Sequence, residues 1–381
     1  MNLFLLCSLF LSAVTIKASQ DEIKRNICYR AVIKKPIIDM NNSFPAPKNS
    51  VASPDTKGCD RAHQGLFNEM VNCLEEHNDQ VKVAIDNIIY GFDIDTKKPL
   101  NTFWTYKKNI IPTTEINNDL LLTIPNQEYG KEPTVVLTYP WQQFSAGTRF
   151  KHIPEDDSST AYAIARADFQ TDTIVFDYVS HEHALPETVQ DPKSARTLFV
   201  ATINNLIDNV TKNGSELVIP YIWGGSSFVE LYTKSDFYQK DGTWHRTEKN
   251  SPYSGYDCSE FVMRMAKIAG IEFPWKTSTA IQRSKRELNQ YDQLEEGDLI
   301  WTPGHVMIVS SIANNELIEA RGYSSGYGSV HRATLAESFD GITSYYDLLD
   351  RYYSKQPIKY KDKQGNVVEK PYELKLLKLI D

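Results

Sequence analysis

The chain has 381 residues, and 49 Asp and Glu against 41 Lys and Arg give it a formal net charge of -8. This acidic balance argues against a general nucleic-acid binder, because such a protein needs a basic face to neutralise phosphates. Hydrophobic residues make up 41% of a chain that is longer than one ordinary domain, so we expect two or three folded domains rather than disorder. The 21 Tyr, 16 Phe, 18 Gly and 18 Pro favour strands and turns.

The N-terminus carries an apolar run over residues 3–16, which is too short to cross a membrane as a helix. Small residues at Ala18 and Ser19 offer a cleavage site, so residues 1–19 are predicted to be a signal peptide. An uncleaved N-terminal anchor is the alternative. No later stretch has the apolar length of a membrane span, and we therefore expect an exported protein without a transmembrane segment once the signal is removed.

Four cysteines lie beyond the predicted signal peptide. Cys28, Cys59 and Cys73 cluster in the first quarter of the chain, whereas Cys258 stands alone. An exported protein can oxidise one pair among the first three, and all three pairings remain open.

The middle of the chain predicts two regions of different secondary structure. Residues 20–115 are predicted to be partly helical, because apolar residues recur at roughly helical spacing over residues 66–89. Residues 116–192 carry short runs rich in Val, Ile, Leu and Tyr, typical of strands in a small β-barrel, at 120–124, 134–139, 162–165 and 173–178. Within them, residues 145–150 resemble the turn-strand element of bacterial SH3-like domains. An amphipathic helix over residues 195–210 then opens a last domain, residues 193–381.

Cys258 lies where a turn, Ser-Gly-Tyr-Asp, leads into apolar residues at helical spacing that end before Gly270. This pattern places Cys258 in the first turn of a helix. Unpaired N–H groups and the helix dipole favour thiolate over thiol there, and the same N–H groups could hold an oxyanion. Taken alone, such a cysteine is more often a small buried apolar residue.

A base and an orienting residue follow in the chain. Gly297–Trp301 and the segment from His305 read as two strands, with His305 on the same face as Met307 and Val309. After a turn at Asn314 and Asn315, Glu319 falls on a neighbouring strand, where it could accept a hydrogen bond from the His305 ring. The order of helix-borne Cys, strand-borne His and strand-borne polar residue is that of papain-like catalysis.

Five blocks of sequence in this order resemble the NlpC-type cell-wall cysteine peptidases. They are Tyr-Ile-Trp-Gly-Gly at 221–225, Tyr-Asp-Cys-Ser-Glu-Phe-Val at 256–262, Gly-Asp-Leu-Ile at 297–300, His-Val-Met-Ile at 305–308 and Leu-Ile-Glu-Ala at 317–320. The resemblance extends over about residues 194–332 and implies an α+β protein with a compact papain-like C-terminal domain. Many members cleave the bond between D-γ-glutamate and a diamino acid in peptidoglycan stem peptides.

The resemblance also implies roles for individual residues. Cys258 would be the nucleophile, His305 the general base and Glu319 the orienting residue. Tyr221 would line the site near the thiol, and Asp257 and Ser259 would bind substrate, Asp257 through a free substrate amine. Neither a metal nor an organic cofactor is expected, and the expected partner is a peptidoglycan stem peptide or murein fragment, whereas the oligomeric state stays open.

The sequence departs from the family pattern at three places. Glu260 stands where the family usually has Gly, and could narrow the site or point to solvent. Glu319 replaces the commoner His, Asn or Gln, which is chemically acceptable because a carboxylate stabilises imidazolium. Residues 226–255 are a long connection rich in aromatic residues, which could cap the cleft, contact glycan or pack as a loop.

Other interpretations of these features remain open. His331 is an alternative to Glu319 as the orienting residue, and His181 and His183 could share one face of a strand but lack a third metal ligand at a recognisable spacing. Two rival functions also remain. One is an exported amidase or acyltransferase that acts on a substrate other than the wall, and the other is a non-catalytic wall-binding protein.

Overall fold

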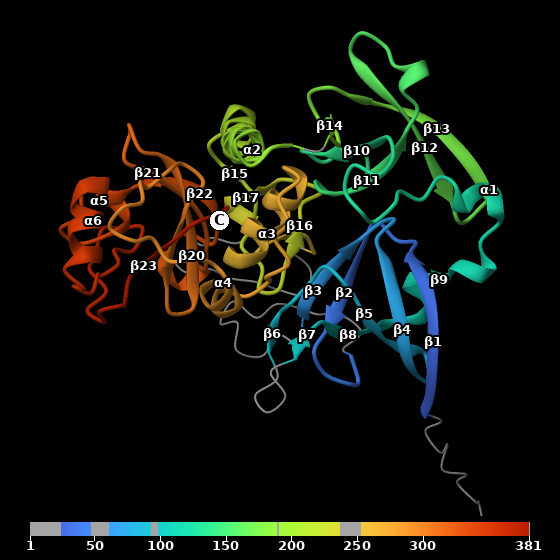
Figure 1. Ribbon diagram of the computed structural model, residues 1–381, viewed down its shortest axis with the longest axis horizontal. Helices are drawn as coiled ribbons and strands as arrows, with labels where there is room; N and C mark the ends of the chain where they lie inside the picture. Colours follow the sequence, from blue (N-terminus) through green and yellow to red (C-terminus); the bar gives the residue numbers. More distant parts are fainter. Residues whose placement is uncertain (1–23, 47–60, 93–97, 189, 237–252, 381) are drawn as a thin grey trace, which may run out of the picture.

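The computed structural model describes residues 24–46, 61–92, 98–188, 190–236 and 253–380. The predicted signal peptide, residues 1–19, lies outside these ranges. Three antiparallel sheets of five or more strands follow one another along the chain, and the longer described helices gather around the third (Figure 1). In the part of the chain that is described, no helix combines the length and apolarity that a membrane span requires.

The first sheet has seven strands in the order β3-β2-β8-β5-β4-β1-β9. Its neighbouring strands are antiparallel, and buried residues such as Ile33, Val83 and Phe103 contribute to the largest hydrophobic core of the protein. The strands are β1 (Lys24–Ile33), β2 (Ile37–Asn41), β3 (Arg61–Leu66), β4 (Met70–His77), β5 (Gln80–Ala84), β8 (Thr102–Tyr106) and β9 (Ile110–Pro112), beside a separate pair β6 (Gly91–Phe92) and β7 (Pro99–Leu100).

The helix predicted within residues 66–89 is wrong, because this segment contains β4 and β5. The two strands are joined by a hairpin turn in which Asn78 has φ 53°, a left-handed conformation that Asn tolerates. A register shift between Cys73 and Glu75 marks a β-bulge in β4. The turn and the bulge both interrupt the period-two alternation of apolar residues. The apolar residues are therefore spaced along the sequence much as they would be in a helix.

The second sheet has the order β13-β12-β11-β10-β14. Its strands are β10 (Thr134–Leu137), β11 (Arg149–His152), β12 (Ala161–Asp168), β13 (Thr173–Ser180) and β14 (Ala184–Pro186). This order places β13 and β14 at opposite edges, and the SH3-like barrel expected from the sequence is not confirmed. The strand predicted at residues 120–124 is also wrong, since α1 (Asn118–Leu121) ends within this range and a turn follows it. Asn117 caps this helix by accepting a hydrogen bond from the Asp119 amide.

The third sheet has the order β22-β21-β20-β19-β23 and lies between two groups of helices (Figure 1). Alternate residues of its strands divide between two cores: Val306 and Ile308 join the core that contains α3, whereas Met307 and Val309 join the core that contains α6. The strands are β19 (Leu299–Thr302), β20 (His305–Ser311), β21 (Glu316–Arg321), β22 (Ser329–Thr334) and β23 (Lys375–Leu377), and the helices are α2 (Pro192–Asn213), α3 (Cys258–Ile268), α4 (Ser278–Ser284), α5 (Leu335–Ser338) and α6 (Tyr345–Tyr353).

Two short strand pairs connect these layers. β15 (Leu217–Val218) pairs with β17 (Tyr232–Thr233), and β16 (Ser226–Ser227) pairs with β18 (Gly255–Tyr256) immediately before α3.

The cysteines of the first sheet are not joined to each other. Cys28 is an exposed free thiol and Cys73 a buried one, whereas Cys59 lies outside the described residues. The pairing of Cys28 with Cys73 is therefore absent from the structure.

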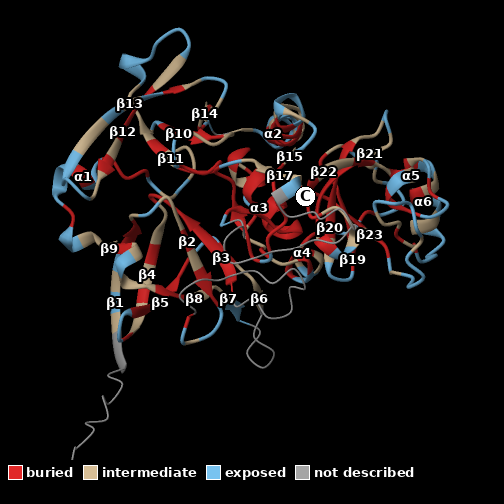
Figure 2. Cartoon of the chain, turned by 180° about the vertical axis from the view of Figure 1, so that it is seen from behind, coloured by how far each residue is buried: buried red, intermediate tan, exposed pale blue. Residues whose placement is uncertain are grey.

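Arg264 on α3 ties the third domain to the two sheets that precede it. Its side chain is 1% exposed and donates to Glu69 Oε1 (2.8 Å), in the turn between β3 and β4, and to the Ser226 carbonyl (3.0 Å). Gly147, in the loop before β11, has φ +90°, and a Cβ atom there would lie 2.4 Å from Arg264 Cδ. In Figure 2, α3 and β3 are both coloured as buried where they face each other.

We expect Arg264→Met to destabilise the protein by about 3 kcal/mol, because it leaves the Glu69 carboxylate largely buried without its cation. The free energy of unfolding in urea, followed by far-UV circular dichroism, measures this loss. Arg264→Met combined with Glu69→Gln should recover part of it, whereas Arg283→Met, at an exposed position of α4, should change little. Equal losses in the single and double variants would contradict the pairing.

Candidate functional site

The N-terminus of α3 is built by Asp257, which caps the helix directly before Cys258. Asp257 Oδ1 accepts hydrogen bonds from the Ser259 amide (3.0 Å), the Glu260 amide (2.8 Å) and the Ser259 hydroxyl (3.0 Å). Its Oδ2 accepts from the Gly224 amide (3.0 Å), so one carboxylate joins the helix start to the loop after Tyr221. Cys258 is thereby held in the first turn of α3 and is 7% exposed.

That loop approaches the first sheet so closely that it requires glycine. Gly224 has φ +66°, and a Cβ atom there would lie 2.3 Å from the Arg61 carbonyl oxygen on β3. The first sheet therefore packs directly against the loop that Asp257 joins to the start of α3.

His305 opens β20 and contacts both other members of the predicted triad. It hydrogen-bonds with Cys258, and its Nε2 lies 2.5 Å from Glu319 Oε2 on β21. Burial lowers the pKa of His305, but the contacts with Cys258 and Glu319 outweigh it and raise that pKa to about 9. Contact with a cysteine on one side and a carboxylate on the other stabilises an imidazolium at neutral pH.

Glu319 is held ionised although its side chain is fully buried. Burial favours the neutral acid, but Arg321, the hydrogen bond with His305 and the nearby His331 hold the pKa of Glu319 well below its usual range. The second oxygen, Oε1, lies 3.3 Å from His331 Nε2 and 3.5 Å from an Arg321 nitrogen. The two histidines considered from the sequence thus lie on opposite sides of the same carboxylate.

The predicted substrate-binding residues surround the start of α3. Tyr221 is 7% exposed, makes a bridge with Tyr256 and lies edge-on to Tyr323. Asp257 and Ser259 are buried and hydrogen-bonded to each other. Burial raises the pKa of Asp257 to about 6, opposed by Lys276. Tyr221, Asp257 and Ser259 therefore all lie near Cys258. Most hydrogen-bond acceptor positions of the Asp257 carboxylate are used by groups of the protein itself.

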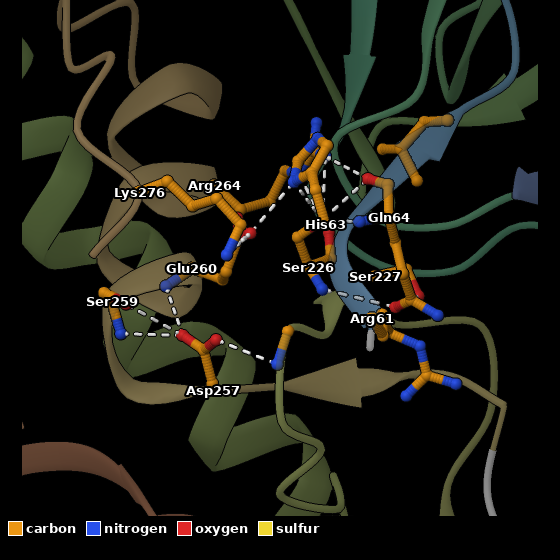
Figure 3. A network of polar contacts seen from close by, with 12 residues as sticks. Arg61, His63, Gln64, Ser226, Ser227, Asp257, Ser259, Glu260, Arg264 and Lys276 are labelled. Carbon is orange, nitrogen blue, oxygen red and sulfur yellow. Dashed lines mark hydrogen bonds and ion pairs between the residues drawn. The ribbon is translucent and has the colours of Figure 1, made fainter. Parts of the chain in front are cut away.

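Glu260 neither points to solvent nor is left unpaired. Its fully buried Oε1 lies 2.9 Å from His63 Nδ1 on β3 and 3.0 Å from Lys276 Nζ (Figure 3). Burial raises the pKa of Glu260 to about 7, although Lys276 counteracts it. Burial lowers the pKa of His63 well below its usual value, so this histidine is neutral. The sequence analysis did not identify His63 and Lys276. The signal for them was Glu260 itself, because a charged residue among apolar residues of a helix needs partners if it is buried.

Much of the aromatic connection over residues 226–255 lies outside the described residues. Among those described, Phe228 is buried, and its amide donates a hydrogen bond to Ser145 Oγ (2.8 Å). The Tyr253 carbonyl accepts from Gln64 Nε2 (2.7 Å). Both ends of the connection are therefore attached to the preceding sheets.

His181 and His183, considered as metal ligands, lie in the turn between β13 and β14. Within the described ranges, no group of three or more His, Cys, Asp or Glu side chains is placed to hold a metal ion.

The chain is similar to known proteins of the NlpC/P60 family. A crystal structure of an NlpC/P60 family protein from Bacillus cereus has a TM-score of 0.53 at 17% identity, over 80% of this chain and 94% of that one. This likeness is one of fold. NlpC2 from Trichomonas vaginalis (TM-score 0.32, 12% identity, 94% and 99% covered) and the peptidoglycan hydrolase RipB from Mycobacterium tuberculosis (TM-score 0.23, 19% identity, 51% and 74% covered) are more distant.

A search of curated proteins found no match. The family model of the NlpC/P60 family matches residues 218–343, a stretch that contains α3 and β19–β22. It includes all five blocks on which the resemblance was based. Residues 218–343 of this chain are therefore an NlpC/P60 family domain.

Proposed function

We propose that this protein is an exported cysteine endopeptidase that hydrolyses peptidoglycan stem peptides between D-γ-glutamate and a diamino acid, either diaminopimelate or Lys. The observation that carries this proposal is the line of contacts from Cys258 through His305 to Glu319, at the start of a capped helix inside an NlpC/P60 domain. Export through the predicted signal peptide would place the enzyme in the periplasm or cell envelope, where that substrate is found.

In this reaction His305 takes the thiol proton of Cys258, which leaves a thiolate beside an imidazolium. The thiolate attacks the carbonyl carbon of the scissile amide, and N–H groups in the first turn of α3 stabilise the oxyanion that forms. His305 then gives its proton to the departing amine as the C–N bond breaks and a thioester remains. A water molecule, deprotonated by His305, attacks the thioester and releases the carboxylate product and the thiol.

Substrate binding is assigned to Tyr221, Asp257 and Ser259. Asp257 Oδ2 accepts one hydrogen bond within the protein, from the Gly224 amide, so a second lone pair on this oxygen is available to a substrate amine. The sheets that precede the domain support this assignment, since β3 packs against the loop between Tyr221 and Asp257. We propose that these sheets limit the substrate site to short peptides with a free N-terminus.

We expect the protein without residues 1–19 to cleave defined stem peptides after D-γ-glutamate, and Cys258→Ala to abolish this cleavage because it removes the nucleophile. Mass spectrometry of the products, from stem peptides and from purified peptidoglycan, identifies the bond. Cys28→Ala is the matched control, since this exposed thiol lies in the first sheet. Faster cleavage of peptides with a free L-Ala amine than of N-acetylated ones would support the role of Asp257. Intact stem peptides in every reaction would contradict the proposed function and favour the transferase or the binding protein.

The raised pKa of His305 predicts the pH dependence of the reaction. Because the imidazolium must protonate the leaving amine, kcat/KM should fall as pH rises through about 9. Glu319→Gln removes the charge that stabilises the imidazolium, so this decline should begin at lower pH, with kcat reduced by about 10²- to 10⁴-fold. Glu316→Gln, on the same strand, is the control. An unchanged alkaline limb in Glu319→Gln would show that Glu319 does not act on His305.

A further inference from the structure

The last part of the chain reaches the strands that carry the site. Residues 354–374, between α6 and β23, lie beyond the stretch that the family model matches. They are attached to the domain where Tyr360 makes a bridge with Phe339 and where the Lys361 amide donates to the Ser338 carbonyl (2.9 Å). Tyr360 is only 6% exposed, so its side chain belongs to the interior of the domain.

The buried ring of Tyr360 contacts two residues of the site. It lies edge-on to His305, with centroids 6.2 Å apart and planes inclined by 69°. The Tyr360 hydroxyl lies 2.7 Å from Thr302 Oγ1, and Thr302 is the register partner of His305 across β19 and β20. The guanidinium of Arg321 lies over the same ring, 4.7 Å from its centroid. Tyr360 thus contacts both the strand that begins with His305 and the strand that carries Arg321.

Three groups hold the guanidinium of Arg321 in one orientation. It lies over the rings of Tyr360 and Tyr327 (5.2 Å), and its Nη2 donates to the Lys361 carbonyl (2.9 Å). Its other terminal nitrogen, Nη1, lies 3.5 Å from Glu319 Oε1, which is an ion-pair distance. Because a guanidinium is planar and rigid, contacts on its faces and at one nitrogen also fix the place of the other nitrogen. Tyr360 and Lys361, both from residues 354–374, therefore determine where this cation meets Glu319.

The charge of Arg321 has a large effect on the buried carboxylate. Burial raises the pKa of Glu319, and Arg321 is the strongest of the groups that counteract burial and hold this pKa well below its usual range. The titratable and charged groups that face Glu319 are His305 on β20, Arg321 on β21, His331 on β22, and the phenols of Tyr327 and Tyr360. Among them, a guanidinium is the group whose charge does not depend on pH.

We infer that Tyr360 is a positioning residue of the site: together with the Lys361 carbonyl, it holds the guanidinium of Arg321 against Glu319, beside His305. The segment that follows the family domain in the chain thus completes a site whose Cys, His and Glu all lie within that domain. The consequence for catalysis rests on the proposed function, whereas the effect on the reactivity of Cys258 can be measured without substrate.

The test measures the rate at which iodoacetamide alkylates Cys258 as a function of pH, by mass spectrometry of the peptide that contains this residue. Formation of the reactive thiolate removes one proton from the cluster of Cys258, His305 and Glu319, wherever the remaining proton lies. The cluster becomes more negative by one charge, and a cation held nearby favours that state. Loss of the Arg321 charge should therefore move the acid limb of the alkylation profile to higher pH.

Arg321→Met should move this limb by about one pH unit, which is a tenfold lower rate at a given pH. Tyr360→Leu, which releases the guanidinium, should move it by about half a unit and should add nothing when Arg321→Met is already present. Tyr360→Phe keeps the ring face and should show less than half of the Tyr360→Leu shift. Tyr346→Leu, at an 80% exposed position of α6, is the matched control and should leave the profile unchanged.

Two results would overturn the inference: an unchanged profile in Arg321→Met, or a Tyr360→Leu shift of the same size with and without Arg321. Should Tyr360→Leu fail to fold, Arg321→Lys decides instead. This variant keeps the charge but lacks the planar group that lies over the ring of Tyr360 and reaches the Lys361 carbonyl. A shift toward higher pH is expected, and an unchanged profile would overturn the inference.

Failure of the proposed function gives a different result. If Cys258 of the unaltered protein reacts as an ordinary thiol, the proposed function fails and this inference with it. The expected shifts without cleavage of stem peptides would support the inference and contradict the proposed substrate alone.

Discussion

The buried charges on α3 are the constraint on which the rest of the structure depends. Glu260 and Arg264, one helical turn apart, are almost completely removed from water. A buried charge is costly unless it is paired or hydrogen-bonded, so each must have a partner. Both find one in the N-terminal part of the chain: the neutral His63 ring on β3 is hydrogen-bonded with Glu260, and Glu69, in the turn after β3, pairs with Arg264. The relative position of the first sheet and α3 is thereby specified by pairing as well as by apolar packing.

This pairing has consequences at the thiol. Glu260 lies two residues after Cys258, and its carboxylate also pairs with Lys276. The backbone amide of Lys276 donates a hydrogen bond to the carbonyl of Ile89, which precedes the second sheet in the chain. The Gly224 loop is fixed between Arg61 on one side and Asp257 on the other. Residues far away in the sequence therefore determine the surroundings of Cys258, and the first sheet contributes to them directly.

The opposite side of the site is organised by a single carboxylate. Glu319 is the meeting point of His305, His331 and Arg321, and three cationic or potentially cationic groups around one anion keep it ionised in a buried position. Strand geometry produces this arrangement, because Arg321 follows Glu319 on the same face of β21 and His331 is its register partner on β22. A histidine at position 319, which is common in the family that this domain resembles, has no negative charge to interact with Arg321 and the two histidines.

The sequence by itself determined the local features of this protein. The capping Asp257, the helix that begins at Cys258, and the strands that begin at His305 and contain Glu319 depend on neighbouring residues and on short-range periodicity, and the family blocks lie in those same elements. The segment that forms β4 and β5 was predicted to be helical, because a bulge near Cys73 and a turn at Asn78 alter the spacing of its apolar residues. Only the tertiary structure decided the pairing of Glu260 with His63 and the place of His331 beside Glu319. The first joins a strand to a helix 197 residues further along the chain. The second depends on the register between two strands, which no local pattern in the sequence specifies.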